Sequence, residues 1–202
     1  MNSKIIMSGI SILSALAVMG GATFAFFSSQ GTSTNNVFAA GTLGLKVDDN
    51  DEAAATTISA SFGSGALAPG ASSSGFVSLH NSGTLSIAEV ALGANETSNN
   101  NSGTSDLADV LNMTVKTGDD NTCVSGMVDQ TSAINAQIGP GSPNLTLAEL
   151  NTTDYDSLPG VSVGPDKYVC MTFTMDPSAG DVYQNNSITE DFVFTGHQDV
   201  SQ

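Results

Sequence analysis

Positive charge is the scarcest property of this chain. Its 202 residues contain four Lys and Arg together, all of them lysine, against 20 Asp and Glu, and the formal net charge is −16. Nucleic acids are bound through cationic side chains that displace phosphate counterions, and anionic lipid surfaces attract the same side chains. The composition therefore argues against nucleic acid and anionic membranes as partners and indicates an acidic protein exposed to solvent.

Residues and motifs that carry catalysis are also scarce. The chain has two histidines, His80 and His197, and no HExxH segment. A zinc protease site normally combines two His and a carboxylate with a general-base Glu. There is no GxSxG turn and no phosphate-binding glycine loop. We therefore expect no catalytic residues and no enzymatic activity.

No apolar segment reaches the length of about 20 residues that spans a bilayer. The longest is Ile5–Met19, which follows the single charge of Lys4 and is interrupted by serines. Thr23–Ala25 then ends in the small residue that precedes signal cleavage. We predict a signal peptide over residues 1–25, removed by signal peptidase, a secreted or cell-surface product, and no permanent membrane anchor.

The predicted mature protein is one domain. Removing residues 1–25 leaves 202 − 25 = 177 residues with three lysines, so the net charge becomes 3 − 20 = −17. That length is enough to bury one core. An alternative is a type IV pilin signal cut near Gly9, in which case the mature chain retains Ile10–Met19.

The chain has two cysteines, Cys123 and Cys170. Exported thiols usually become oxidised, and an even count fits one bridge. Closing that loop would stabilise the fold by about 4 kcal/mol in the chain-entropy model. The alternative is two buried free thiols.

Short alternating runs between turn residues predict an all-β, antiparallel β-sandwich. The Leu67–Gly70 turn and the Asn81–Gly83 turn separate three of these runs, and the second turn is expected to close a hairpin. The sets expected to share one face of a strand are Leu43, Leu45 and Val47; Ile58, Ala60 and Phe62; Ala88, Val90 and Leu92; Val169, Met171, Phe173 and Met175; and Ile188, Phe192 and Phe194. Further strands are expected at Phe76 to Leu79 and around Met113 and Val115.

One or two short helices are expected beside the strands. Ser105 is placed to cap a helix through Leu111, and a second helix is expected near Thr146–Leu150. Asn95–Thr104 has no periodicity and is expected to be a polar loop. The segment 119–153 carries no other clear signal.

Three ordered blocks resemble the secreted fibre protein TasA and its camelysin relatives. They are the signal-to-first-strand segment GGATFAFFSS with VFAAGTLGLKV, the block LAPGASSSGFVSLHNSGTLSIAEVAL, and the closing segment VYQNNSITEDFVFTGHQ. Residues 95–165 lie outside the match, apart from the helix near Asp106–Leu111. Related archaeal bundling pili are similar in design.

The resemblance implies a jelly-roll sandwich that polymerises by donor-strand complementation. By position, the donor arm is residues 26–36, followed by a sandwich domain over residues 37–202. The residues expected to form the donor strand are Phe26, Phe27, Ser28, Ser29, Gln30, Gly31, Thr32, Ser33 and Thr34. After the two phenylalanines this arm is more polar than that of the family. Phe27 corresponds to the family's early aromatic residue.

A sandwich that lacks one strand exposes unpaired backbone groups, and a neighbour's extended arm can satisfy them. Such contacts run head to tail and generate an open filament of copies of this chain. One alternative is that residues 26–36 form an ordinary N-terminal tail of a monomeric, adhesin-like binding module. Another follows from the protease label of the camelysin branch, which suggests a secreted metalloprotease.

Two acidic runs and several sequons are further candidate sites. No cofactor is required, but calcium is a candidate ligand because hard oxygen donors gather at Asp48, Asp49, Asp51, Glu52, Asp119 and Asp120. Neither run has EF-hand spacing, and acidic runs are often simply solvated. Possible N-glycosylation sites are Asn95, Asn100, Asn112, Asn144, Asn151 and Asn185.

Overall fold

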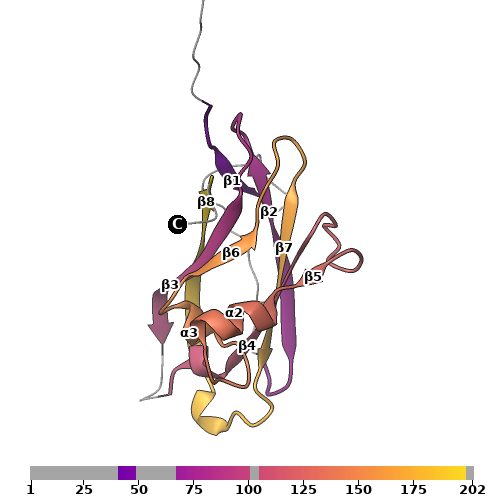
Figure 1. Ribbon diagram of the computed structural model, residues 1–202. Helices are drawn as coiled ribbons and strands as arrows, with labels where there is room; N and C mark the ends of the chain where they lie inside the picture. The colour runs from indigo at the N-terminus through magenta and orange to yellow at the C-terminus, as the bar shows by residue number, and fades with distance from the viewer. Residues whose placement is uncertain (1–40, 49–66, 101–104, 199–202) are drawn as a thin grey trace, which may run out of the picture. The chain divides into compact units, whose positions relative to one another are not determined.

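Two antiparallel sheets face each other in this protein (Figure 1). The computed structural model describes residues 41–48, 67–100 and 105–198. Within these residues a five-stranded sheet has the order β1 (Leu45–Asp48), β2 (Ser72–Asn81), β7 (Lys167–Met175), β4 (Leu111–Gly118) and β5 (Val128–Asp129). A three-stranded sheet has the order β6 (Tyr155–Pro159), β3 (Glu89–Asn100) and β8 (Ser187–His197). The all-β sandwich is confirmed.

The core lies between the sheets because alternate residues of each strand point inward. Val169, Met171 and Phe173 of β7 are buried, as the alternation predicted. Val90 and Leu92 of β3 meet them from the other sheet. The rings of Phe173 and Phe192 have centroids 5.7 Å apart and join β7 to β8.

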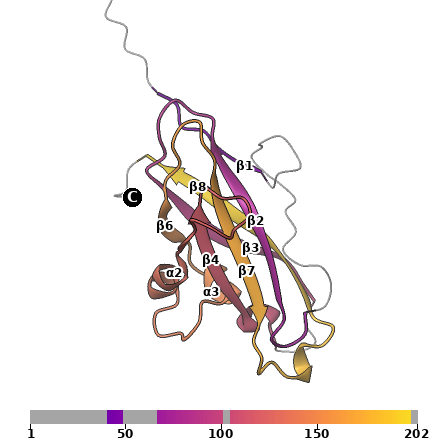
Figure 2. The same ribbon diagram turned by 90° about the vertical axis from the view of Figure 1, so that its right-hand side faces the viewer.

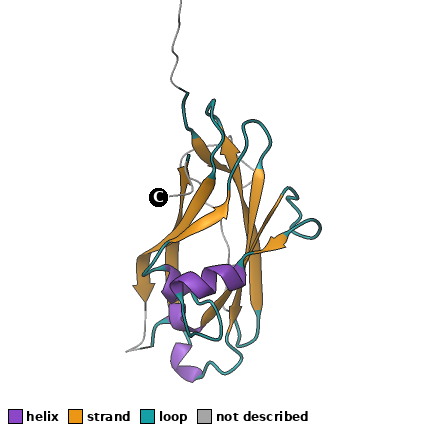
Figure 3. Cartoon of the chain, in the orientation of Figure 1, coloured by secondary structure: helices purple, strands orange, loops and turns teal. Residues whose placement is uncertain are grey.

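The helices gather at one end of the sandwich (Figure 3). They are α2 (Thr131–Ile138), α3 (Leu147–Leu150) and the short 3₁₀ helices η1 (Leu107–Val110) and η2 (Asp181–Tyr183). The expected helix near 146–150 is confirmed as α3, and its capping box joins Thr146 to Glu149. None of the helices among the described residues has the length and apolarity to cross a membrane.

Several expectations about the first half of the chain are corrected. Asn81–Gly83 does not close a hairpin, because β2 pairs with β1 and β7 while β3 pairs with β6 and β8 in the other sheet. Thus 82–88 is a connection between sheets. The expected first strand begins at Leu45, and Leu43 is 39% exposed. The expected strand at Ile58–Phe62 lies outside the described residues.

Asn95–Asn100 is strand and not loop. These residues continue β3 and pair with Ser187–Asp191 of β8, so backbone pairing extends the strand although its side chains are mostly exposed. The helix expected from Ser105 is the single turn η1, and its cap is Asp106. The Asp106 carboxylate accepts a 2.9 Å hydrogen bond from the Ala108 amide.

Candidate functional site

The last strand, β8, ends the three-stranded sheet. Among the described residues its strand partner is β3, which pairs with it on one side over most of its length. Along β8, Thr189, Val193 and Thr195 are exposed, while Ile188 and Phe194 are half-buried. A terminal strand of this length presents backbone N–H and C=O groups that another strand can pair with.

The inner side of β8 is less completely covered than the centre of the core. Ile188, Phe192 and Phe194 pack against the core but are only partly buried, and so are Leu45 and Val47 of β1. β1 contacts β8, so the two strands lie close together at one side of the sandwich. This side of the core is therefore the one that a further strand could cover.

A hollow of about 720 Å³ lies beside the first half of β8, from Ser187 to Phe192. Its lining includes Leu67, Pro69 and Met175 from one sheet side and Ile188 and Phe192 from β8. The turn at Pro69–Gly70 forms its rim, where Gly70 has φ +81° and Ala71 donates a 2.8 Å backbone bond to Ala68. Apolar side chains dominate this hollow, as expected for a surface that binds large side chains.

Carboxylates also line this hollow, and Glu190 is the one on β8. Glu190 occupies the inward position between Ile188 and Phe192 and lines the same hollow. Asn151 donates a 2.9 Å hydrogen bond to one Glu190 oxygen, and the other oxygen has no hydrogen-bond partner. Burial raises the pKa of Glu190, and the nearby Glu96 adds to that rise. Strict alternation along β8 predicts that Glu190 faces inward, although the set expected from the sequence included only Ile188, Phe192 and Phe194.

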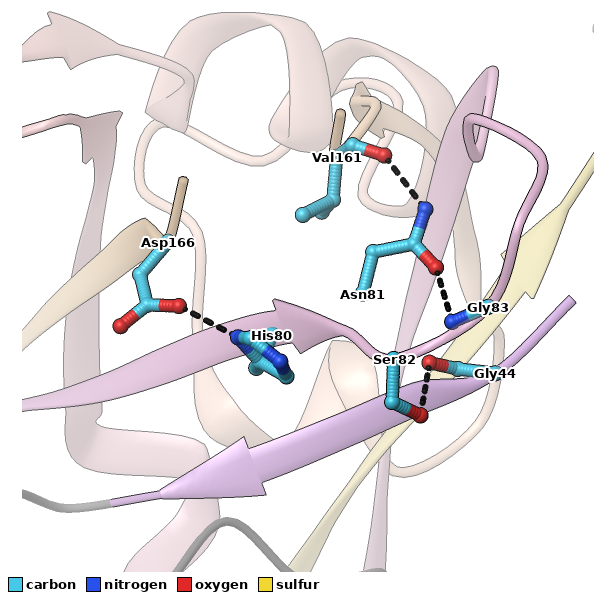
Figure 4. A network of polar contacts seen from close by, with 7 residues as sticks. All are labelled: Gly44, His80, Asn81, Ser82, Gly83, Val161 and Asp166. Carbon is cyan, nitrogen blue, oxygen red and sulfur yellow. Dashed lines mark hydrogen bonds and ion pairs between the residues drawn. The ribbon is translucent and has the colours of Figure 1, made fainter. Parts of the chain in front are cut away.

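The backbone just before β1 is held by a compact polar network (Figure 4). Ser82 donates to the Gly44 carbonyl both from its amide, at 2.7 Å, and from its hydroxyl, at 3.0 Å. Thr84 donates its amide to the Thr42 carbonyl at 2.8 Å, and the Thr42 amide donates to the Thr84 hydroxyl at 2.9 Å. Thr42 and Gly44, just before β1, are therefore held against residues 82–84.

Asn81 organises this network from within the core. It is 2% exposed, and its amide nitrogen donates to the carbonyls of Leu85, at 2.8 Å, and Val161, at 3.1 Å. Its carbonyl oxygen accepts from the Gly83 amide at 2.9 Å. A Cβ on Gly83 would lie 2.3 Å from the Thr42 oxygen, so the close approach of these segments requires glycine there.

Where the structure describes them, the candidate calcium ligands lie apart or already form other hydrogen bonds or ion pairs. Asp119 pairs with Lys167 at 2.7 Å. Asp120 accepts hydrogen bonds from the amides and hydroxyls of Thr122 and Ser125, which hold the pKa of its carboxyl far below the usual range. Asp48 ends β1, and Asp49, Asp51 and Glu52 lie outside the described residues. No group of three or more His, Cys, Asp or Glu in the described ranges could hold a metal ion.

The two histidines lie at strand ends. His80 Nδ1 is 2.7 Å from Asp166 Oδ1 near the end of β2, and both side chains are partly exposed. His197 is the last residue of β8 and lies opposite Glu89 of β3. Within the described part of the chain, neither histidine belongs to a metal-binding group.

The cysteines expected to pair do so. A disulfide joins Cys123 to Cys170 of β7, with their Cα atoms 5.9 Å apart. It fastens the loop after β4 to the outer face of the five-stranded sheet. The sequence predicted the bond but not the loop that it fastens.

The sequon asparagines differ in exposure. Asn95, Asn100, Asn144 and Asn185 are exposed, whereas Asn112 and Asn151 are half-buried. The amide of Asn151 is engaged by Glu190. The predicted donor arm, residues 26–36, lies outside the described residues, as does the predicted signal peptide.

Comparison with known proteins identifies the family. A family model described as camelysin metallo-endopeptidase matches residues 1–202. No curated protein matches the chain. Since the match covers the whole sequence and agrees with the resemblance of its three blocks, the chain belongs to the camelysin family, to which the fibre protein TasA is related.

Proposed function

We propose that this protein is the secreted subunit of an extracellular filament that polymerises by donor-strand complementation. In this proposal residues 26–36 of one copy pair with the β8 edge of the next. The observation that carries the proposal is the partly covered side of the core beside β8, where Ile188 and Phe194 pack without full burial. Membership of the family related to TasA supports it.

Backbone hydrogen bonds would supply most of the affinity. The arm is rich in Ser and Thr, so it offers few large side chains but a complete set of backbone donors and acceptors. An added strand satisfies an edge through such bonds, while alternate side chains set the register. Phe26 and Phe27 are the arm's large apolar residues, and the apolar hollow at Ile188 suits an aromatic ring.

A fixed attachment point for the arm suits head-to-tail growth of a filament. The chain is held at Thr42 and Gly44, which in this proposal would fix the point at which the arm is attached to its own subunit. Because the arm of each copy pairs with the next copy, the β8 edge of that first copy stays open for the arm of a third copy. Such a contact does not close on itself and gives an open filament. Removal of the signal peptide would release the arm and so start assembly.

Deletion of residues 26–36 tests the proposal. We expect the shortened protein to keep its far-UV circular dichroism but to form no filaments by electron microscopy and to elute as a monomer. A peptide of residues 26–36, added in excess, should raise its melting temperature, since a ligand that binds only the folded state stabilises it. Polymers of the shortened protein would refute the donor assignment.

Cross-linking tests the acceptor edge with a matched control on the same sheet. A cysteine scanned through residues 28–34 is combined with Thr189→Cys on β8 or with Asp156→Cys on β6, the opposite edge. We expect intermolecular disulfides with Thr189→Cys in at least one register and none with Asp156→Cys. Equal cross-linking at both edges would contradict the choice of β8.

Two other functions remain as alternatives. A monomeric binding module predicts that the mature protein stays monomeric at every concentration. The family's protease label favours a secreted metallo-endopeptidase. A cleavage assay on an unstructured protein substrate, with and without a chelator, tests that function directly.

A further inference from the structure

The outer face of the five-stranded sheet carries rows of hydroxyl groups. Ser72 and Thr174 lie opposite each other on β2 and β7, with their hydroxyl oxygens 2.8 Å apart. Ser74 and Thr172 form a second such pair at 2.8 Å. Thr114 of β4 lies opposite Thr172 on the other side and extends this second row across three strands. Figure 2 shows β2, β7 and β4 side by side.

The second row lies in a hollow that the first row does not line. A space of about 650 Å³ is lined by Ser74, Thr172 and Thr114, whereas Ser72 and Thr174 are outside it. Its wall is formed by Thr122 and its neighbours in the loop after β4. The disulfide fastens this loop to β7 through Cys123, which itself lines the hollow.

The wall is ordered by its own hydrogen bonds. The Asp120 carboxylate accepts from the amide and hydroxyl of Thr122, at 2.9 and 2.7 Å, and from the amide and hydroxyl of Ser125, both at 3.0 Å. With the disulfide, these bonds shape the hollow before any ligand arrives. A preformed site loses less conformational entropy on binding than a site that must become ordered.

The lining of the hollow combines polar and apolar groups. Asn121 adds an amide, Lys116 adds an ammonium group, and Phe76 adds an aromatic ring held edge-on against Tyr168 with centroids 5.7 Å apart. No Asp or Glu is among the residues that line it. Lys116 lies opposite Asp129 of β5 and, after the hydrogen bonds from Thr131, helps to lower the pKa of that carboxyl.

We propose that this hollow binds a neutral pyranose of a glycan. Sugar hydroxyls both donate and accept, and the Ser74–Thr172 pair, Thr114 and Asn121 offer both capacities around one hollow. The apolar C–H face of a pyranose suits the ring of Phe76. Lys116 donates to a sugar oxygen. A polyanionic glycan is disfavoured because the chain as a whole carries a net charge of −16.

NMR titration of the full chain, purified in the form that cells release, tests the site. The probes are cellohexaose and chitohexaose as neutral glycans and an oligogalacturonate of equal length as the acidic one. We expect at least one neutral probe to shift the amide signals of Thr114, Lys116 and Thr122, and a weaker response to the acidic probe. Absence of binding by both neutral probes would overturn the proposal, as would shifts confined to other surfaces.

Two matched variants separate the hollow from the hydroxyl rows in general. Thr172→Val removes a hydroxyl inside the hollow, and Thr174→Val removes the equivalent hydroxyl outside it. Loss of one hydrogen bond predicts roughly five-fold weaker binding for Thr172→Val and no change for Thr174→Val. Equal effects of the two variants would overturn the assignment of the site. This inference is independent of filament formation, because it concerns the opposite sheet from β8.

Discussion

Two buried polar residues of β2, three positions apart, differ in their hydrogen bonding. Asn81 is 2% exposed and makes three hydrogen bonds, whereas Ser78 is 4% exposed and its hydroxyl has no partner. Removing a buried side chain that forms hydrogen bonds leaves its partners unsatisfied, whereas removing a buried polar group without a partner leaves no donor or acceptor unsatisfied. The contrast allows hydrogen bonding to be separated from burial.

We expect Asn81→Ala to lower the free energy of unfolding by about 3 kcal/mol, because the Gly83 amide and the Leu85 carbonyl lose this partner and the Val161 carbonyl keeps only its bond from the Ile87 amide. Ser78→Ala should be within about 0.5 kcal/mol of the parent, or stabilising. Urea denaturation followed by circular dichroism gives both values. A small effect of Asn81→Ala would show that water replaces its hydrogen bonds.

Glu190 makes stability depend on pH in a defined direction. Its folded-state pKa lies above the unfolded value because burial disfavours the charge, so the folded state binds a proton more readily than the unfolded chain. Its charge therefore costs stability above the folded pKa, and this cost disappears as the pH falls through that value. Below the unfolded pKa it contributes no penalty.

Glu190→Gln should accordingly stabilise the protein at pH 7 by about 0.5–1 kcal/mol, in the range measured for partly exposed charges. The advantage should vanish at about pH 3, where the parent carboxyl is protonated. Thermal melts at both pH values measure it. Asp156→Asn, which removes the same charge from an exposed site on β6, is the control. An equal gain from that control would assign the effect to net charge instead of burial.

At the scale of elements, regular alternation was the reliable guide. β4, β7 and β8 appear where alternation predicted them, and α3 has the capping signal of Thr146 and Glu149. β6 was missed because a bulge disturbs its pairing with β3. Val90 and Leu92 are two positions apart in β3, whereas their partners Leu158 and Tyr155 are three positions apart in β6.

Other elements depend on contacts that a local pattern does not specify. α2 was missed because it buries only Ile134 and Ile138, and no side chain caps it. The turn at Asn81–Gly83 has a hairpin signature, but the next strand joins the other sheet because Asn81 ties this turn to Val161. Of the candidate site, alternation predicted the apolar residues of β8. The hollow depends on packing between distant segments and was not predicted.

The disulfide fixes one loop and is also expected to stabilise the whole fold against unfolding. Replacing both Cys123 and Cys170 by serine should lower the free energy of unfolding by about 4 kcal/mol in the chain-entropy model, since the bond closes a loop between residues 47 apart. Guanidinium denaturation of this variant and of the reduced parent should give the same value. A difference between them would indicate that the serines themselves disturb the packing.

For the whole molecule, charge opposes the assembly that we propose. Each copy that has lost residues 1–25 carries a net charge of 3 − 20 = −17, and a filament places such copies in contact. Their repulsion acts over the Debye length, which falls from about 30 Å at 0.01 M salt to about 10 Å at 0.1 M. Backbone pairing between the arm and β8 is short-ranged and is little affected by such screening.

Assembly should therefore strengthen as salt is added. We expect the concentration of unpolymerised subunit at equilibrium to fall at least several-fold between 0.01 and about 0.15 M NaCl, as screening becomes effective. Sedimentation followed by assay of the supernatant measures it. The variant without residues 26–36 distinguishes screening from simple salting out, because it should stay in the supernatant at every salt concentration. Filaments that dissolve as salt is added would instead indicate that attraction between charged groups holds the subunits together, a result incompatible with copies joined mainly by backbone pairing.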